Sequence, residues 1–332
     1  MQIFYLIILS ILQFLAIMLP ILICVAYTTL VEREVLASIQ RRKGPNIIGF
    51  AGSLQPLSDG LKLMLKEIIL PTNIDKFLFI LSPIITFTCT MLYWSVLTFA
   101  KGINFNDFNL SLLFIYLISS LSLFGILIAG WASNAKYSFL GSIRSISQMI
   151  SYELPIGTIF SVIYLCTGSL NINKIILLQK YVWFFLPLFP LFIILFISLL
   201  AECNRHPFDL PESEAELVSG FNTEYSAMSF ALFFIGEYGN IINMSVLITI
   251  LFFGGWLPLF NLKIIPGIVW LFLKSSFFVI LYVVARGAFI RFRYDQLINL
   301  SWKILLPLSL CYFLIILSIL LSFNCLPNTI LF

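Results

Sequence analysis

Eight long apolar stretches, almost free of charged residues, constrain this chain more than any other feature of its sequence. A helix needs about 20 consecutive, mostly apolar residues to cross the hydrocarbon core of a bilayer. The stretches of sufficient length cover residues 3–30, 77–99, 111–132, 147–167, 181–201, 228–252, 267–289 and 304–324. The sequence therefore predicts an all-α membrane protein whose residues 1–332 form one multi-pass domain with eight transmembrane helices.

The composition excludes several other classes of protein. Only 10% of the residues are charged, against roughly a quarter in a soluble globular domain. The net charge of +4 is too small to suggest a nucleic-acid partner. The six cysteines are never closer than 14 residues apart, and no glycine-rich nucleotide-binding motif occurs. We therefore expect no metal site and no iron–sulfur cluster held by this chain alone, and none of the usual nucleotide-binding loops.

The basic residues predict an orientation. Of the 19 lysines and arginines, 14 fall in the odd-numbered loops and four in the even-numbered loops, and Lys274 lies within a span. Basic loops stay on the side from which insertion occurs. Both termini are thus expected on the outer side. The first stretch lacks preceding basic residues and a following small-residue cleavage site, so we expect a retained helix and not a signal peptide.

The first loop has an amphipathic pattern beside a basic cluster. Its apolar residues recur at helical spacing from position 54, with charged residues on the other faces, which predicts a helix lying in the membrane interface. The cluster Arg41, Arg42 and Lys43 fits an orientation signal that contacts lipid headgroups. It also fits a docking face or the mouth of a polar pocket that includes Arg33, and the pattern leaves both open.

The fifth loop concentrates acids on the side where basic residues are expected. Against a single Arg205 it carries Glu202, Asp209, Glu212, Glu214, Glu216 and Glu224. Asp209 ahead of Pro211 resembles a helix start. Crowded, partly desolvated carboxylates have raised and coupled pKa values, so this loop could relay protons. A solvated acidic turn is the alternative.

Three charged residues lie well inside predicted spans: Glu153, Glu237 and Lys274. Arg286 lies near the end of the seventh span and is counted with the loop that follows it. An acid at the centre of a membrane helix costs about 2.5–3.5 kcal/mol on insertion scales, so it is expected to face the bundle interior and to serve a function. A neutral, hydrogen-bonded structural role is the alternative for both glutamates. Lys274 is expected either to snorkel or to pair with one of these acids.

The seventh loop alternates Arg291, Arg293 and Asp295 with aromatic residues, after a deeper Arg286. This pattern fits an anchor at the membrane surface with an aromatic belt. It fits equally a site in which Arg286 lies near a buried anion or polar headgroup.

Taken together, the motifs resemble a known family. They are Glu32-Arg33 followed by RKGPN, then LQPLSDGLKLMLKE, SYE, AECNR before PFDLPE, GEY, and RFRYDQL. In this order they resemble subunit 1 of NADH:ubiquinone oxidoreductase, respiratory complex I, from about residue 20 to 310. The pattern departs from the family at Glu34, where lysine is common, at Ile290, where proline is common, and at His206, a position often small and uncharged.

The resemblance implies a membrane subunit of the proton-translocating NADH:ubiquinone reductase, with ubiquinone as substrate and no redox centre of its own. NADH, FMN and the iron–sulfur clusters would belong to partner subunits. The implied partners are the hydrophilic iron–sulfur and quinone-site subunits, the other membrane-arm subunits and lipids, with no nucleic acid. The implied location is the mitochondrial inner membrane, with both termini in the intermembrane space.

The resemblance also implies roles for individual residues. The positions similar to those lining the quinone chamber are Arg33, Asp59, Phe230, Phe234 and Arg286. The positions similar to the proton path are Glu153, Glu202, Asp209, Glu212, Glu214, Glu216, Glu224 and Glu237. The positions similar to subunit contacts are Arg42, Lys43, Arg291, Arg293 and Asp295.

Two other classes of protein remain as alternatives. A membrane anchor of a related hydrogenase complex would share the scaffold but bind no quinone. A stand-alone ion or solute carrier would be expected to show two halves with matching broken helices. The sequence shows no such repeat.

Overall fold

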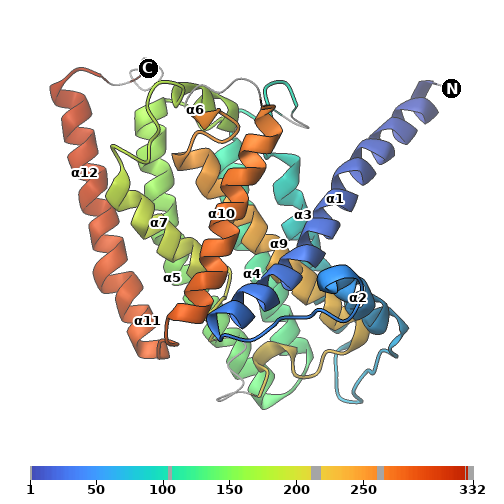
Figure 1. The fold of residues 1–332 in the computed structure, drawn as a ribbon. Helices are drawn as coiled ribbons and strands as arrows, with labels where there is room; N and C mark the ends of the chain where they lie inside the picture. Colours follow the sequence, from blue (N-terminus) through green and yellow to red (C-terminus); the bar gives the residue numbers. More distant parts are fainter. Residues whose placement is uncertain (1, 104–106, 211–217, 260–264, 326, 328–332) are drawn as a thin grey trace.

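The computed structural model describes residues 2–103, 107–210, 218–259, 265–325 and 327, which form a bundle of tilted helices (Figure 1). Within these ranges the only strand-like pairing is an isolated bridge between Ala100 and Ile103. The long helices are α1 (Gln2–Ile39), α3 (Lys76–Leu92), α4 (Ser111–Ala132), α5 (Lys136–Thr167), α9 (Ala227–Phe252), α10 (Gly267–Ala288) and α12 (Leu306–Ser322). The shorter elements are α2 (Gln55–Leu65), α6 (Ile172–Leu178), α7 (Phe189–Glu202) and α11 (Tyr294–Leu300), with single turns η1 (Phe50–Gly52), η2 (Tyr93–Ser95), η3 (Gly220–Asn222) and η5 (Ser301–Leu305).

Seven helical segments in the described residues are long and apolar enough to cross a membrane. They are Leu12–Ile39, Lys76–Ser95, Ser111–Ala132, Lys136–Thr167, Ala227–Phe252, Gly267–Ala288 and Tyr294–Ser322. The all-α multi-pass prediction is thus confirmed. The span predicted over 181–201 is helical only in its second half. There α7 has 14 residues, begins at Phe189 and has Pro190 in its first turn. Such a helix is about 21 Å long at 1.5 Å per residue.

Helix α1 continues past the point where the sequence predicted its end. The apolar stretch stops at residue 30, but the helix runs to Ile39 and carries Glu32 and Arg33 inside it. Helix α5 likewise starts at Lys136 and not at residue 147. Charged side chains do not end a helix when partners on neighbouring elements satisfy them. These extensions place polar groups within the bundle.

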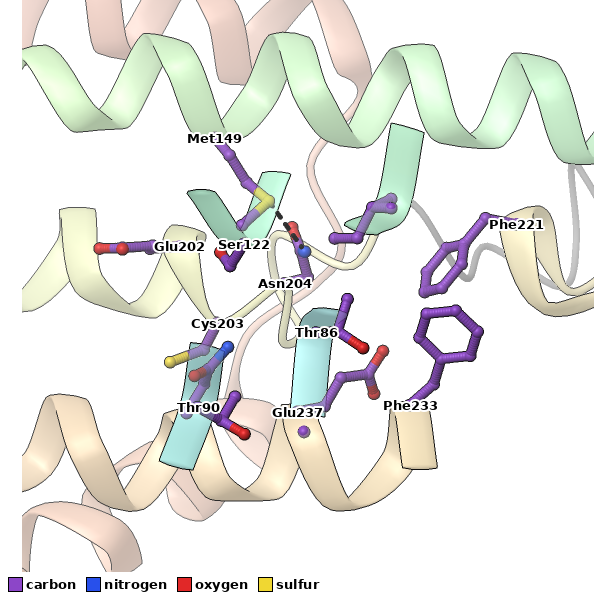
Figure 2. Close-up of a pocket in the computed structure, with 13 residues that line it drawn as sticks. Thr86, Thr90, Ser122, Met149, Glu202, Cys203, Asn204, Phe221, Phe233 and Glu237 are labelled. Carbon is purple, nitrogen blue, oxygen red and sulfur yellow. Dashed lines mark hydrogen bonds between the residues drawn. The ribbon is translucent and has the colours of Figure 1, made fainter. Parts of the chain in front are cut away.

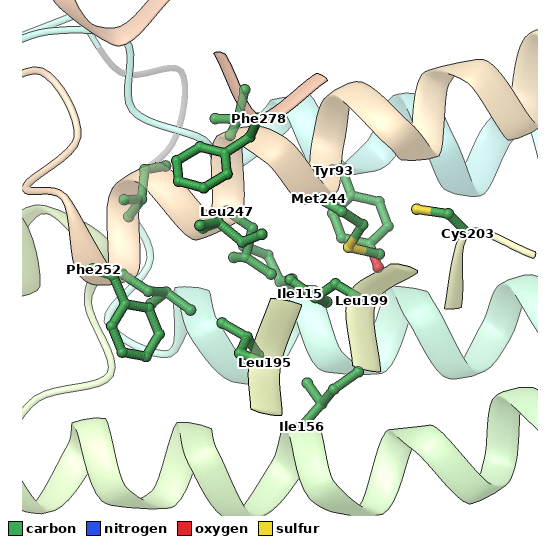
Figure 3. Close-up of a cluster of buried hydrophobic side chains, with 14 of the residues drawn as sticks. Tyr93, Ile115, Ile156, Leu195, Leu199, Cys203, Met244, Leu247, Phe252 and Phe278 are labelled. Carbon is green, nitrogen blue, oxygen red and sulfur yellow. The ribbon is translucent and has the colours of Figure 1, made fainter. Parts of the chain in front are cut away.

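The largest apolar cluster joins α4, α5, α7, α9 and α10 at the centre of the bundle (Figure 3). Ile115, Ile159, Leu195 and Ile248 are at most 1% exposed. In a lipid environment such residues gain little from leaving water, so close packing and dispersion hold the helices together. Helices α1 and α12 lie at opposite edges of the bundle and expose apolar side chains along most of their length (Figure 1).

Helix α2 confirms the helix predicted in the first loop. It packs against α1 and α9, and Figure 1 shows it beside the lower part of α1. Leu57, Leu61 and Met64 are each about 60% exposed, so one apolar face has no protein neighbour in the chain. Such a face suits the boundary between headgroups and acyl chains.

Lys274 neither snorkels to the surface nor pairs with an acid, so both expectations for it were wrong. It is buried in α10 and donates hydrogen bonds to the carbonyl oxygens of Phe253, Gly255 and Leu257, at 2.7, 3.0 and 2.7 Å. Its ammonium lies 4.6 Å from the ring centroid of Trp183. The last carbonyls of a helix have no partner within it. Lys274 therefore fastens the end of α9 to α10.

The Lys274→Met variant is expected to destabilise the chain by about 2–4 kcal/mol, because three carbonyls lose a charged donor inside the protein. The matched control is Lys303→Met, at an exposed lysine. The apparent melting temperature of the purified assembly is expected to fall for Lys274→Met only. Equal melting temperatures for the two variants would contradict this role.

Candidate functional site

A buried carboxylate, Glu32, is the centre of a polar network that joins four elements of the fold. Its side chain is 7% exposed and forms an ion pair with Arg286 of α10. The hydroxyl of Tyr238, on α9, donates to its second oxygen at 2.5 Å. A guanidinium nitrogen of Arg205, in the loop after α7, lies 3.8 Å from the first oxygen. We call Glu32, Arg205, Glu237, Tyr238 and Arg286 the Glu32 network.

Arg205 connects the two acids of the Glu32 network. One of its terminal nitrogens is 3.8 Å from Glu32 and the other is 3.9 Å from Glu237. Its guanidinium also lies 4.1 Å from the centroid of the Tyr238 ring, a cation–π geometry. The network thus holds two carboxylates and two guanidiniums, which balance in charge. Removing one member of such a buried ion pair typically lowers the stability of the folded protein by about 3–5 kcal/mol, because the charge of its partner stays buried without compensation.

Part of this network could be predicted from the sequence. Of the two interpretations left open for Arg286, the ion pair favours the one with a buried anion, and the anion is Glu32. No role was assigned to Glu32, Arg205 or Tyr238. A signal for Glu32 exists, because it follows the buried residues Ile21 and Val25 on the same face of α1 at helical spacing.

Arg33, Asp59, Phe230 and Phe234 lie on the elements around this network. Arg33 of α1 forms a 2.8 Å ion pair with Asp59 of α2, and both side chains are substantially exposed. On α9 the rings of Phe230 and Phe234 are 4.4 Å apart, and those of Phe234 and Tyr238 are 6.4 Å apart. This aromatic row leads along α9 to the hydroxyl that binds Glu32. The structure thereby brings the five predicted chamber residues onto the neighbouring helices α1, α2, α9 and α10.

A small polar cavity separates Glu237 from Glu202. Its volume is about 30 Å³, and its lining includes Thr86, Thr90, Ser122, Asn204 and both glutamates. A site needs roughly 10–15 Å³ to hold one water molecule, so about two waters fit. Figure 2 shows the two acids on different sides of the cavity, with their carboxylates directed away from each other.

Glu202 and Glu153 are neighbours on the far side of this cavity. Glu202 ends α7 and is 5% exposed. The hydroxyl of Ser119 donates to Glu153 at 3.4 Å and also neighbours Glu202, whose charge interacts with that of Glu153. The expectation that Glu153 and Glu237 face the protein interior is met, since Glu153 contacts Ser119 of α4 and Glu237 contacts Arg205 in the loop after α7.

The structure describes only part of the acidic fifth loop. Asp209 forms a 3.1 Å ion pair with Arg291 and so joins two loops. The helix start expected ahead of Pro211 lies outside the described residues. Glu224 is half-buried in the turn before α9. Glu212, Glu214 and Glu216 lie outside the described residues.

The predicted subunit contacts fall into two groups. Arg291 binds Asp209 within the chain. Arg293 and Asp295 form a 3.3 Å ion pair at the surface, with side chains 78% and 66% exposed. Arg42 and Lys43 are exposed as well. Arg42, Lys43, Arg293 and Asp295 thus have side chains at the surface. Arg291 instead forms its ion pair within the chain.

His206 lies beside the Glu32 network, next to Arg205. Burial, together with the nearby charges of Arg291 and Arg286, lowers the pKa of its imidazole below the ordinary value of 6.5. The folded chain therefore favours neutral His206. As the pH falls below 6.5, the unfolded chain takes up a proton more readily than the folded one, and stability is lost.

The His206→Asn variant is expected to lose less stability than the natural chain between pH 7 and pH 5. The measurement is the apparent melting temperature of the purified assembly at each pH, compared for the two proteins. At pH 7, where the imidazole is neutral in both states, the two should differ little. An identical fall on acidification would show that protonation of His206 does not contribute.

The described residues contain no group of three or more histidine, cysteine, aspartate or glutamate side chains that could hold a metal ion. All six cysteines are free. The chemistry of the site thus consists of titratable carboxylates, guanidiniums and aromatic rings.

Comparisons with known proteins agree on one family. The family model described as NADH dehydrogenase matches residues 12–317. The NADH-ubiquinone oxidoreductase chain 1 of Chondrus crispus is 56% identical, over 95% of this chain and 98% of that protein. The chain belongs to the NADH dehydrogenase family. The Arabidopsis thaliana chain 1 is 52% identical over the same shares. A bacterial relative, a subunit of the NADH-quinone oxidoreductase of Rhodospirillum rubrum, is 49% identical, over 97% of this chain and 96% of that protein.

Membership of this family confirms the resemblance on which the site was predicted. The chain is a multi-pass membrane subunit of NADH:ubiquinone oxidoreductase. The described parts of the motifs that carried the resemblance lie in α1, α2, α5, the end of α7, α9, α11 and the adjoining loops. The same elements contribute most residues of the Glu32 network.

Proposed function

We propose that this chain forms the membrane wall of the ubiquinone chamber of complex I and links quinone reduction to proton movement through its buried acids. The observation that carries the proposal is the position of Arg205, within 4 Å of both Glu32 and Glu237. Through Arg205, Glu32 and its partly exposed partner Arg286 are connected to Glu237, which lines the small cavity.

The chamber would lie along α1, α2 and α9. A quinone needs an apolar path for its isoprenoid tail and a few polar groups for its headgroup. The exposed face of α2 and the rings of Phe230 and Phe234 supply apolar surface. The Arg33–Asp59 pair and the half-exposed Arg286 supply hydrogen-bonding groups.

The proton path would start at the Glu32 network and run inward. From Glu237 it crosses the small cavity to Glu202, and from there it passes Ser119 to Glu153. Because the Glu202 carboxylate points away from the cavity (Figure 2), a rotation of this side chain would carry a proton from the water side to the Ser119 side. Asp209, Glu224 and the acids at 212, 214 and 216 would supply protons from the loop.

Reduction of the quinone would act on this path through charge. Ubiquinone takes up two electrons and two protons to become the quinol, and the electrons would come from an iron–sulfur cluster in a partner subunit. Negative charge on the headgroup near Arg286 would compete with Glu32 for that guanidinium. The ion pair between Glu32 and Arg205 would then strengthen, and the ion pair between Arg205 and Glu237 would weaken. A carboxylate that loses its cationic partner binds a proton more readily.

The same proposal gives the orientation of the chain in the membrane and the surfaces that contact other subunits. Helix α7 with the preceding turns would complete an eighth crossing, and both termini would then face the intermembrane space of the mitochondrion. The exposed Arg42, Lys43, Arg293 and Asp295 would meet the hydrophilic iron–sulfur and quinone-site subunits. The exposed edges of α1 and α12 would meet other membrane-arm subunits and lipid.

A photoreactive ubiquinone analogue bound to the assembled complex tests the chamber. We expect label on α2 and on the Phe230–Phe234 segment of α9, and less label when unmodified ubiquinone competes. Phe230→Ala should reduce the label, whereas Phe323→Ala, at an exposed ring beyond α12, should not. A complex whose label avoids α2 and α9 altogether would contradict the proposed chamber and favour an anchor that binds no quinone.

A further inference from the structure

A second, larger cavity lies between α1 and α10. It is a groove of about 770 Å³ whose lining includes Ile23, Cys24, Trp94, Val246, Phe272 and Ile280. None of the described lining residues is charged. We call it the α1–α10 groove. Figure 1 shows α1 diverging from α10 toward its N-terminus.

The size and shape of the groove match one hydrocarbon chain. Its volume lies within the roughly 300–1,000 Å³ of small-molecule sites, and an apolar cavity holds no stable water. From Ile268 to Ile280 it follows α10 for about 18 Å at 1.5 Å per residue. One leaflet of a bilayer is about half of the 30 Å hydrocarbon core. The groove, at about 18 Å, is therefore close in length to the acyl region of one leaflet.

A lysine stands at one end of the groove, where a lipid headgroup would lie. Phe99 and Ile103 both line the groove, and the turn between them is closed by the bridge from Ala100 to Ile103. Lys101 is at the tip of this turn and is exposed. A cationic side chain beside an apolar groove is complementary to a phosphate attached to an acyl chain.

We infer that the α1–α10 groove binds one acyl chain of a phospholipid whose phosphate contacts Lys101. A quinone is a poorer occupant, because its headgroup is uncharged and gains little from the charge of Lys101, whereas a phosphate is attracted by it. The inner end of the groove reaches Val31, the residue before Glu32. The bound chain would thus support the part of α1 that carries the Glu32 network. The inference goes beyond the proposed function and does not depend on it.

The test uses the assembled complex in nanodiscs that contain a phosphatidylcholine with a photoreactive group midway along one acyl chain. We expect the groove residues to be labelled more than Leu314, an exposed residue of α12. Ser276→Phe, which fills the groove, should lower groove labelling to the level of Leu314. Leu273→Phe, on the exposed face of the same helix, should leave it unchanged. Lys101→Glu should reduce labelling about fivefold, as expected for the loss of one basic contact to a headgroup.

A second measurement on the natural chain covers the case in which Ser276→Phe does not assemble. Alkylation of Cys24 by N-ethylmaleimide should be faster after delipidation and slower when phosphatidylcholine is added back. The inference is overturned if the groove is labelled no more than Leu314. It is overturned equally if the rate of Cys24 alkylation does not change with lipid. It is also overturned if a long-tailed quinone displaces the label, or if the groove cross-links to a helix of another subunit.

Discussion

Replacing Glu32 with alanine is expected to destabilise the chain by about 3–5 kcal/mol, because Arg205 and Arg286 would then face each other without their shared carboxylate. The two guanidiniums lie on different elements and are joined through Glu32. We therefore expect little assembled complex to accumulate. Blue-native electrophoresis of solubilised membranes measures the amount of assembled complex directly.

Two variants separate the charge of Glu32 from its packing. Glu32→Gln keeps the shape and should assemble better, but quinone reductase activity per assembled complex should fall about tenfold, an effect of roughly 1.4 kcal/mol. Glu34→Ala is the matched control, since Glu34 lies two residues away on the exposed side of α1 and a surface substitution is usually within about 0.5 kcal/mol. Normal assembly of Glu32→Ala would show that the network does not hold the fold together.

Replacing Glu202 with glutamine is expected to lower the rate of proton pumping at least about tenfold, because a positioned proton-transfer group contributes roughly 10²–10⁴ in rate. Glutamine keeps the volume of the side chain and its contact with Ser119 but cannot exchange a proton. Proton uptake and release by the assembled complex in liposomes, measured together with NADH oxidation, is the appropriate assay.

The matched control for this variant is Glu67→Gln, at an exposed acid near the end of α2. Its pumping and NADH oxidation should equal those of the natural chain. Glu237→Gln, on the opposite side of the small cavity, should resemble Glu202→Gln. If Glu202→Gln pumps protons and oxidises NADH at natural rates, Glu202 has no part in the relay.

The sequence predicted the elements of the fold better than their ends. Apart from the stretch over 181–201, the predicted spans coincide closely with helices or lie within longer ones, because a charge-free apolar stretch has few alternatives in a membrane. The end of α1 was missed because the predicted span stops where the charge-free stretch stops, at residue 30, whereas the helix runs on to Ile39. The partners of Glu32 come from positions 205, 238 and 286. No local pattern in the sequence connects these positions.

The residues of the candidate site also differ in how well the sequence predicts them. Arg286 and Glu237 could be singled out because a charge inside an apolar stretch is costly and needs a partner. Arg205 could not, since a lone arginine in an acidic loop looks like a solvated counter-ion. Lys274 shows the opposite error: an acid was sought as its partner, but backbone carbonyls at the end of α9 satisfy it. Such contacts depend on how helices pack and leave no trace in residue types.

Infrared difference spectroscopy of the assembled complex, with and without quinone reduction, tests most directly whether buried carboxyl groups exchange protons in response to the quinone. The account predicts a change in the carboxylic acid C=O band on reduction, diminished in Glu202→Gln and Glu237→Gln and preserved in Glu67→Gln. A band change that is the same in all four proteins would contradict the proposed link between the Glu32 network and the acids beyond it.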